Sequence, residues 1–292
     1  MSITGVILAG GTGSRLFPIT RCISKQLLPI YDKPMIYYPM SVLMIADIRD
    51  VLIITTSMDQ QNFIELLGDG SQLGMRIRYA VQNEPGGIAQ AIHIAEPYAK
   101  GNRVCLVLGD NLFYGQGLNE KLTIAINNTD KATVFAHHVV NPEQFGVVEL
   151  DASGQIVSLL EKPQQTRSNL AITGLYFYPE DVFDFARDLQ PSQRGELEIT
   201  DLNIQYLEVD RLQVNVLGRG FAWLDTGTFE SLSDANDFVR AVQKRQGLKI
   251  ASVEEIAYRK GWIDGDTLER LAAEFKGNEY GCYLADLHGK IQ

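Results

Sequence analysis

The chain has 292 residues, of which 45% are hydrophobic and 21% charged, and its formal net charge is −10. This length allows a large buried core in one or two domains, and the composition is that of an ordinary globular protein. The acidic balance argues against binding of nucleic acid, which requires a basic surface. We find no signal-peptide pattern and no apolar run approaching about 18 residues, so the sequence predicts a cytoplasmic protein without a membrane span.

Residues that often bind metals or act as nucleophiles are scattered along the chain. Its three cysteines are widely spaced and form no Cys-x-x-Cys pair, which argues against a disulfide framework or a zinc site. His137 and His138 are adjacent in an expected strand, so they point to opposite faces and cannot share a metal ion. The sequence offers no obvious catalytic triad.

In the first half of the chain, β-branched apolar runs alternate with helical segments. The strands are expected at residues 3–9, 51–56, 76–81 and 103–109. The helices are expected at residues 35–46, 60–67 and 88–98. This alternation is typical of an α/β fold with a mostly parallel sheet flanked by helices, in which ligands bind at the carboxyl ends of the strands.

A glycine-rich loop follows the first expected strand, in the segment Leu8-Ala9-Gly10-Gly11-Thr12-Gly13-Ser14-Arg15-Leu16. Three glycines in four positions let the backbone turn sharply and approach a ligand closely. Consecutive backbone N–H groups in such a turn can bind an anion, and Arg15 and Lys25 add positive charge. The loop therefore predicts a polyphosphate site.

Other interpretations of this loop are weaker. The Walker pattern is absent, and Leu16 stands where a dinucleotide fingerprint requires its third glycine. A tight turn without a ligand would be the simplest interpretation of the glycines alone. Arg15 and the segment Ser24-Lys25-Gln26 favour the phosphate site instead.

The second half is richer in strands and ends in helices. Strands are expected at residues 132–139, 146–150, 156–161, 171–178 and 212–217. We expect this half to continue the first sheet, because no Pro/Ser-rich linker separates the two. A long helix at 229–246 is closed by Gly247, and Ser252/Glu255 and Asp266/Glu269 are spaced as capping pairs for two further helices.

Charged residues also stand at the ends of later strands. Asp110 and Asp225 each follow an apolar run. An aspartate in this position can be a turn or capping residue, or it can face a metal ion. The sequence alone does not place the two aspartates close together. Lys162 stands between Glu161 and Pro163, where a solvated surface lysine is the simplest interpretation. Pro163 disfavours helix at Lys162, so we expect the strand to end there with Lys162 extended.

These motifs together resemble those of the sugar-phosphate nucleotidylyltransferases. The glycine loop with Lys25 before Leu27-Leu28-Pro29 matches the family signature. Five more motifs then follow in family order, at residues 108–111, 145–147, 161–163, 173–176 and 223–227. The resemblance covers the whole chain, and it implies a Rossmann-like nucleotidyltransferase fold over residues 1–246. Residues 1–130 would bind the nucleotide, 131–228 the sugar phosphate, and 247–292 would form a helical appendage.

The resemblance also implies a reaction and a site. The chain looks similar to the branch that joins dTTP and α-D-glucose 1-phosphate into dTDP-glucose and pyrophosphate, the first step of dTDP-L-rhamnose biosynthesis. By resemblance, the catalytic residues are Arg15, Lys25, Asp110 and Lys162, and Asp110 and Asp225 bind Mg²⁺. The nucleotide-binding residues would be Leu8, Gly10, Gly11, Thr12, Gly13, Ser14, Gln26, Gln82, Pro85 and Gly87. The sugar-phosphate-binding residues would be Asn111, Gly146, Glu161, Lys162, Thr173 and Tyr176.

Members of the family that this sequence resembles differ in the nucleotide base that they recognise. Gln82 carries a donor and an acceptor, which match the imide edge of a pyrimidine, and the segment Gly87-Ile88-Ala89-Gln90-Ala91 resembles the thymidylyltransferase branch. A uridylyl- or cytidylyltransferase, or a non-catalytic nucleotide-sugar sensor, are the alternatives. A sensor could lose Arg15, Lys25, Asp110 or Asp225, and all four are present.

The family resemblance further implies a homotetramer that is inhibited by the end product dTDP-rhamnose at a second nucleotide site. The matching positions in this sequence are Tyr114, Gly115, Arg219, Glu255 and Arg259. The two arginines would suit a diphosphate.

Overall fold

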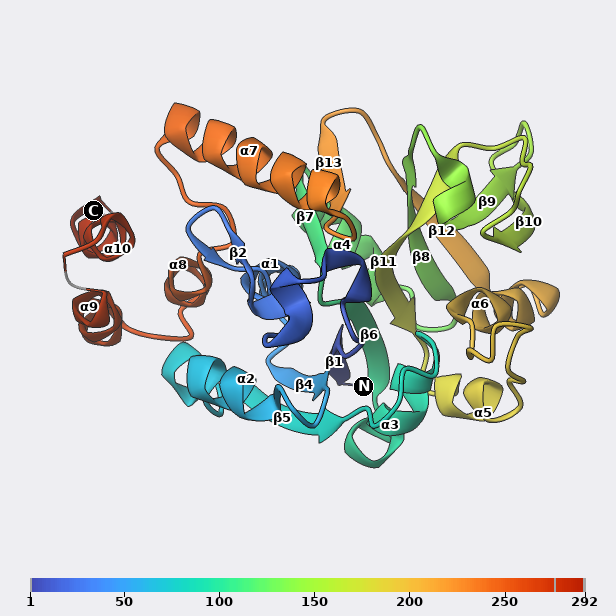
Figure 1. The fold of residues 1–292 in the computed structure, drawn as a ribbon, viewed down its shortest axis with the longest axis horizontal. Helices are drawn as coiled ribbons and strands as arrows, with labels where there is room; N and C mark the ends of the chain where they lie inside the picture. The colour runs from blue at the N-terminus through green and yellow to red at the C-terminus, as the bar shows by residue number, and fades with distance from the viewer. Residues whose placement is uncertain (1, 276, 291–292) are drawn as a thin grey trace.

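The fold is built around one nine-stranded mixed sheet, seen in a computed structural model that describes residues 2–275 and 277–290 (Figure 1). Four neighbouring strands run parallel in the order β6-β1-β4-β5. They are β1 (Ile3–Ala9), β4 (Asp50–Thr55), β5 (Arg76–Val81) and β6 (Arg103–Leu108). The apolar runs of β1, β4 and β6 reflect burial on both faces of the sheet, whereas the edge strand β5 carries Arg76 and Arg78. All four were predicted to within one residue.

Five further strands, paired mostly antiparallel, extend this sheet into the second half of the chain. They are β8 (Ala132–His138), β9 (Gly146–Leu150), β10 (Ile156–Glu161), β11 (Leu170–Tyr178) and β12 (Leu212–Leu217). β11 pairs antiparallel with β6, β8 and β9, while β12 runs parallel to β8. One continuous sheet therefore joins the two halves, as expected from the absence of a linker.

Helices cover both faces of the sheet. One core contains buried residues of α1 (Tyr37–Ile45), α2 (Gln60–Leu67) and α4 (Leu118–Asn127) together with inward residues such as Ile7 and Val107. The other core, on the opposite face, contains buried residues of α3 (Gln90–Ala99), α5 (Val182–Arg187) and α6 (Ile199–Glu208). It also contains Val6 and Leu106, which precede Ile7 and Val107 in the same strands and so point to the other face of the sheet. This alternation confirms the predicted α/β fold with helices on both sides.

A small ladder beside the main sheet brings distant parts of the chain together. It pairs β7 (Asn111–Gly115) antiparallel with β13 (Phe221–Asp225), in the register Asn111↔Asp225. A second short hairpin joins β2 (Pro29–Ile30) to β3 (Lys33–Pro34). α7 (Phe229–Gln246) contacts both β13 and β2, and ends at Gly247 with φ +68°, as predicted (Figure 1).

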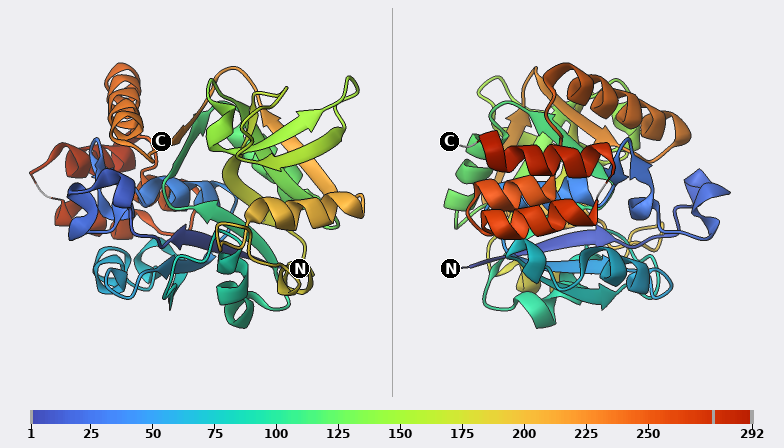
Figure 2. Two further views of the ribbon diagram at one scale, coloured as in Figure 1. Left: turned by 45° about the vertical axis from the view of Figure 1, so that its right-hand side comes forward. Right: turned by 90° about the vertical axis from the view of Figure 1, so that its left-hand side faces the viewer.

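Three helices follow α7, whereas capping signals predicted two. They are α8 (Val253–Arg259), α9 (Gly265–Glu274) and α10 (Glu279–Lys290). Ser252 is the N-cap residue of α8, as predicted, although its side chain makes no capping hydrogen bond. The capping pair for α9 was wrong, because Asp264 rather than Asp266 caps this helix by accepting the Thr267 N–H at 2.9 Å. The three helices lie at the opposite end of the molecule from the β9–β10 hairpin (Figure 1, Figure 2).

The longest helices are amphipathic rather than uniformly apolar. Among residues 2–275 and 277–290, no helix combines the length and the hydropathy that a membrane crossing requires.

Candidate active site

The glycine loop after β1 forms the wall of a cavity of about 320 Å³. Gly11 and Gly13 have φ of +94° and +58°, which explains why glycine is needed there. The Thr20 hydroxyl holds the turn by donating to the Gly13 carbonyl at 2.7 Å. Eight other expected residues line this cavity: Gly10, Thr12, Ser14, Arg15, Lys25, Gln26, Pro85 and Asp110.

Three expected nucleotide-binding residues, Leu8, Gln82 and Gly87, do not line that cavity. The Leu8 carbonyl accepts the Gly109 N–H at 2.9 Å and ties β1 to the end of β6. Gln82 is buried against Gly10, and Gly87 is packed against Leu197 with φ +95°. The backbone of Leu8 thus holds the end of β6, and the side chain of Gln82 lies beside the glycine loop at Gly10.

Asp110 stands directly after β6 and is held by a buried lysine. Lys25 Nζ, in a side chain only 8% exposed, lies 2.6 Å from Asp110 Oδ2. Burial alone would raise the pKa of the Asp110 carboxyl, but the Lys25 charge and the hydrogen bonds from Lys25 and Asn111 outweigh it and hold the pKa below its ordinary value. Asp110 is therefore ionised at neutral pH.

Asp225 reaches the same place from the other end of the chain. The β7–β13 register sets Asp225 opposite Asn111, and the Thr226 N–H donates to the Asp110 carbonyl at 3.2 Å. Burial and the nearby Asp110 charge raise the pKa of Asp225, although Lys25 and Arg15 oppose this. A Cβ on Gly227 would lie 3.2 Å from Asp225 Oδ2 and 3.3 Å from Arg15 Nη1, so this glycine leaves room for both.

The two carboxylates form a donor set suited to a divalent cation. Within the described part of the chain, no group of three or more His, Cys, Asp or Glu side chains could hold a metal. Mg²⁺ typically takes one or two carboxylates and completes its shell with phosphate oxygens and water. Asp110 and Asp225, beside the cavity of the glycine loop, fit that requirement.

Asn111 occupies the centre of a hydrogen-bond network. Its Oδ1 accepts the Trp223 indole N–H at 2.6 Å and the Gly174 N–H at 3.0 Å. Both partners can only donate, so Asn111 Nδ2 must point to Asp110 Oδ1, 2.9 Å away. Asn111 thus orients the carboxylate of Asp110, and Trp223 and Gly174 fix Asn111.

A second cavity of about 380 Å³ adjoins the first on the side of β9, β10 and β11. It contains most of the expected sugar-phosphate residues, namely Asn111, Gly146, Glu161, Lys162 and Tyr176. Arg15 and Asp110 line both cavities. Thr173 is an exception: it is fully buried and does not line the cavity, whereas its neighbours Ile172 and Gly174 do.

Lys162 differs from its predicted conformation. The strand β10 ends at Glu161 as predicted, but Lys162 has φ +42°, which is left-handed rather than extended. Its N–H donates to the Phe145 carbonyl at 3.0 Å, which holds this uncommon conformation. Pro163 disfavours the right-handed helical region for Lys162, and the hydrogen bond to Phe145 favours the left-handed region over the extended one.

Two residues that the sequence did not single out hold Glu161. Thr200 Oγ1 donates to Glu161 Oε2 at 2.6 Å, and Arg194 Nη2 lies 3.0 Å from Glu161 Oε1. Arg194 is itself fixed by Glu198, at 2.8 Å. The charged run Arg194-Gly195-Glu196-Leu197-Glu198 before α6 was the available signal, but nothing in it points to Glu161.

A separate cavity of about 480 Å³ lies between β7, α4 and α8. Four of the five residues expected at a second site line it: Tyr114, Gly115, Glu255 and Arg259. Arg259 Nε is 2.7 Å from Glu255 Oε1. Arg219 does not line the cavity; it lies exposed in the turn before Phe221, the β13 partner of Gly115.

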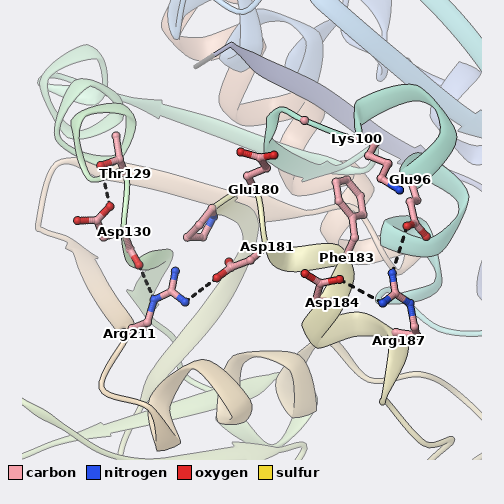
Figure 3. A pocket seen from close by; sticks show the side chains of 12 residues that line it. Glu96, Lys100, Thr129, Asp130, Glu180, Asp181, Phe183, Asp184, Arg187 and Arg211 are labelled. Carbon is pink, nitrogen blue, oxygen red and sulfur yellow. Dashed lines mark hydrogen bonds and ion pairs between the residues drawn. The ribbon is translucent and has the colours of Figure 1, made fainter.

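Another hollow, of about 650 Å³, lacks the features of a phosphate site (Figure 3). Its two arginines are already paired, Arg211 with Asp181 at 2.6 Å and Arg187 with Asp184 at 3.1 Å. Figure 3 shows Arg211 paired with Asp181, which links the start of β12 to the start of α5. Arg187 also reaches Glu96 of α3, 3.4 Å away, while its pair with Asp184 lies within α5.

Comparison with known proteins agrees with this geometry. The family model described as nucleotidyl transferase matches residues 4–242. A glucose-1-phosphate thymidylyltransferase of Neisseria meningitidis is 58% identical over 283 residues, which cover 97% of this chain and 98% of that protein. The enzyme of the same name from Mycobacterium tuberculosis is 53% identical, with 97% of this chain and 98% of that protein covered.

Solved structures give the same result. A structure described as a candidate glucose-1-phosphate thymidylyltransferase of Bacillus anthracis, in complex with sucrose, has a TM-score of 0.76 and 40% identity, covering 82% of this chain and 96% of that chain. A UDP-glucose pyrophosphorylase bound to UDP-glucose has a TM-score of 0.71 at 22% identity, covering 84% of this chain and 100% of that chain, and so shares the fold. The chain therefore belongs to the nucleotidyl transferase family, among the glucose-1-phosphate thymidylyltransferases.

Proposed function

We propose that the chain transfers the thymidylyl group of dTTP to the phosphate of α-D-glucose 1-phosphate, giving dTDP-glucose and pyrophosphate. The observation that carries this proposal is the meeting of two cavities at Arg15 and Asp110. One has a glycine-rich wall suited to a triphosphate, and the other has polar groups suited to a sugar. A nucleotide and a sugar phosphate bound there would have their phosphates adjacent.

The nucleotide phosphates are proposed to bind the backbone N–H groups of the glycine loop, with Arg15 and Lys25 supplying positive charge. The base would lie against Gln82 and Gly87, beside Gly10. Glu161 would accept hydrogen bonds from sugar hydroxyls, because Thr200 and Arg194 hold its carboxylate in one orientation. Lys162 would hold the phosphate of the sugar 1-phosphate.

The proposed reaction is a single in-line displacement. A phosphate oxygen of glucose 1-phosphate forms a bond to the α-phosphorus of dTTP, and the bond from that phosphorus to the pyrophosphate oxygen breaks. A phosphate dianion is already a nucleophile at neutral pH, so no general base is needed. Lys162 aligns the nucleophile, while Arg15 and the loop N–H groups stabilise the leaving pyrophosphate. Mg²⁺ held by Asp110 and Asp225 would neutralise charge on the nucleotide phosphates.

The test is product identification with purified protein, dTTP, glucose 1-phosphate and Mg²⁺. We expect dTDP-glucose and pyrophosphate in equal amounts, with dTTP preferred over ATP. Formation of ADP-glucose instead, or of no nucleotide sugar from any of the common triphosphates, would refute the proposal.

We also propose a division of the chain. Residues 1–130 would bind the nucleotide, 131–228 the sugar phosphate, and 247–292 would take no part in the reaction. The product would supply dTDP-L-rhamnose biosynthesis, and we propose that the reaction takes place in the cytoplasm.

A second site for dTDP-rhamnose is proposed in the cavity lined by Tyr114, Gly115, Glu255 and Arg259. Two observations support this proposal: the cavity is separate from the two cavities that Arg15 and Asp110 line, and Arg259 stands at its wall. Arg219 is proposed to belong to it from the adjoining turn, within a homotetramer. Allosteric feedback inhibition requires two such coupled sites.

A further inference from the structure

Four groups beside the base region form one chain of contacts. The Gly86 N–H donates to Gln90 Oε1 at 3.0 Å, and Gln82 Nε2 donates to the same oxygen at 2.6 Å. Gln82 Oε1 then lies against Gly10, because a Cβ on Gly10 would be only 2.2 Å from it. The chain thus runs from Gly86 through Gln90 and Gln82 to the glycine loop.

The orientations of both side-chain amides follow from one backbone group. A backbone N–H can only donate, so the Gln90 atom beside Gly86 must be its oxygen. The Gln82 atom beside that oxygen must then be its NH₂ group, and Gln82 Oε1 must point away from Gln90. Two oxygens facing each other at 2.6 Å would repel, so the reversed orientation of Gln82 is disfavoured.

Glycines provide the space for this arrangement. A Cβ on Gly86 would lie 2.8 Å from the Gln90 side-chain amide, and a Cβ on Gly10 would displace Gln82 Oε1. Gln82 is only 6% exposed, so water cannot readily replace these partners. The arrangement presents one acceptor, Gln82 Oε1, and one remaining Nε2–H of Gln82.

We propose that Gln90 sets the base specificity by locking the Gln82 side-chain amide in the orientation that accepts an imide and rejects cytosine. This inference rests on the proposed function, in which Gln82 faces the base of dTTP. Thymine and uracil present an N3–H donor beside the C4 carbonyl acceptor, which match Gln82 Oε1 and Nε2. Cytosine presents an N3 acceptor beside an N4 amino donor, so it requires the reversed amide that Gln90 opposes.

Gln90 is the first residue of α3, so its role could instead be to hold the loop 83–89. Two substitutions separate these roles. Gln90→Glu keeps an oxygen acceptor for Gly86 and Gln82. Gln90→Met keeps the length and approximate volume of the side chain but removes the acceptor. If Gln90 sets the choice of base through its side-chain oxygen, only Gln90→Met should change that choice.

The experiment is a competition between equimolar dTTP and dCTP with glucose 1-phosphate and Mg²⁺. The ratio of dTDP-glucose to dCDP-glucose then gives the ratio of kcat/KM values. We expect Gln90→Met to lower this ratio roughly tenfold, the effect of losing about one hydrogen bond. Gln90→Glu should stay near the wild-type ratio. The ratio for dTTP against dUTP should not change in either variant, because both bases present the same imide edge.

The inference is overturned if Gln90→Met keeps the wild-type preference for dTTP over dCTP, or if Gln90→Glu loses it equally. The KM for glucose 1-phosphate should not change, and a large increase would also indicate a structural role. If Gln90→Met fails to fold, Gln90→Leu gives the same readout. Failure of the wild-type protein to use dTTP would refute the proposed function itself, whereas an unchanged ratio in an active variant refutes only the role of Gln90.

Discussion

Asp110 and Asp225 lie side by side because Asn111 and Asp225 are partners in the β7–β13 ladder. Thr226 strengthens this junction with two hydrogen bonds to the Asp110 carbonyl, from its N–H and its hydroxyl. The two carboxylates differ in charge environment: Lys25 compensates Asp110, while burial and Asp110 itself raise the pKa of Asp225. A divalent cation between them and a triphosphate would relieve this repulsion.

Asp110→Asn and Asp225→Asn should each abolish Mg²⁺-dependent turnover, because each removes a charged metal ligand. The two variants should differ in stability. Asp225→Asn removes a like-charge contact and should not lower the melting temperature, whereas Asp110→Asn leaves the buried Lys25 without its carboxylate and should lower it. Pyrophosphate release across a Mg²⁺ titration, with melting curves, tests both points. Near-wild-type release at low Mg²⁺ in either variant would defeat the metal assignment.

Arg15→Ala should reduce kcat by roughly 10²–10³, as expected for the loss of one donor to the transition state. Arg15 is exposed in the cavity, so the melting temperature should hardly change. Steady-state kinetics with both substrates measures the effect. Arg21, an exposed arginine in the same segment that lines neither catalytic cavity, offers a matched control. An equal loss in Arg21→Ala would show that general charge, not the position of Arg15, matters.

Lys162→Ala should raise the KM for glucose 1-phosphate more than the KM for dTTP, since Lys162 lines the sugar cavity and not the cavity of the glycine loop. Because Lys162 has φ +42°, a backbone effect must be separated from loss of the amine. Lys162→Gly provides this control, as glycine adopts that conformation freely. Both variants should lose affinity for the sugar phosphate. If only the KM for dTTP rose, the two phosphate sites would be assigned the wrong way round.

Arg259→Ala and Arg219→Ala should retain catalytic activity but lose inhibition by dTDP-rhamnose, because each would remove a cation that pairs with the diphosphate. Initial rates at increasing dTDP-rhamnose and several dTTP concentrations are the measurement. Inhibition that stays intact in both variants and strictly competitive with dTTP would mean that the inhibitor binds only at the active site.

The sequence was most informative where function depends on local backbone. Three glycines after an apolar strand predicted the loop at Gly11 and Gly13, and the strand ends placed Asp110 correctly. It could not pair Asp110 with Asp225, because the β7–β13 ladder joins distant segments. Nor could it predict that Arg194 and Thr200 hold Glu161, a contact that depends on how α6 packs against β10.

Two other differences from the predictions arise at single residues. The left-handed conformation of Lys162 is set by its hydrogen bond to Phe145, a long-range partner that overrides the extended preference before proline. Thr173 was expected in the sugar pocket, but its side chain is fully buried, and β11 changes register between Ile172 and Tyr176. Thr173 was placed in the sugar pocket by the family resemblance, which does not show which way a side chain points at such an irregularity.

The proposed direct displacement is tested most directly by measuring the release of pyrophosphate from dTTP in the presence and absence of glucose 1-phosphate. Arg15 and Asp110 line both cavities, so we predict that the two substrates react only when bound together. Pyrophosphate should then form only when both substrates and Mg²⁺ are present, in equal amount to dTDP-glucose, and chelation of the metal should stop it. Pyrophosphate release at a comparable rate without glucose 1-phosphate would contradict the account.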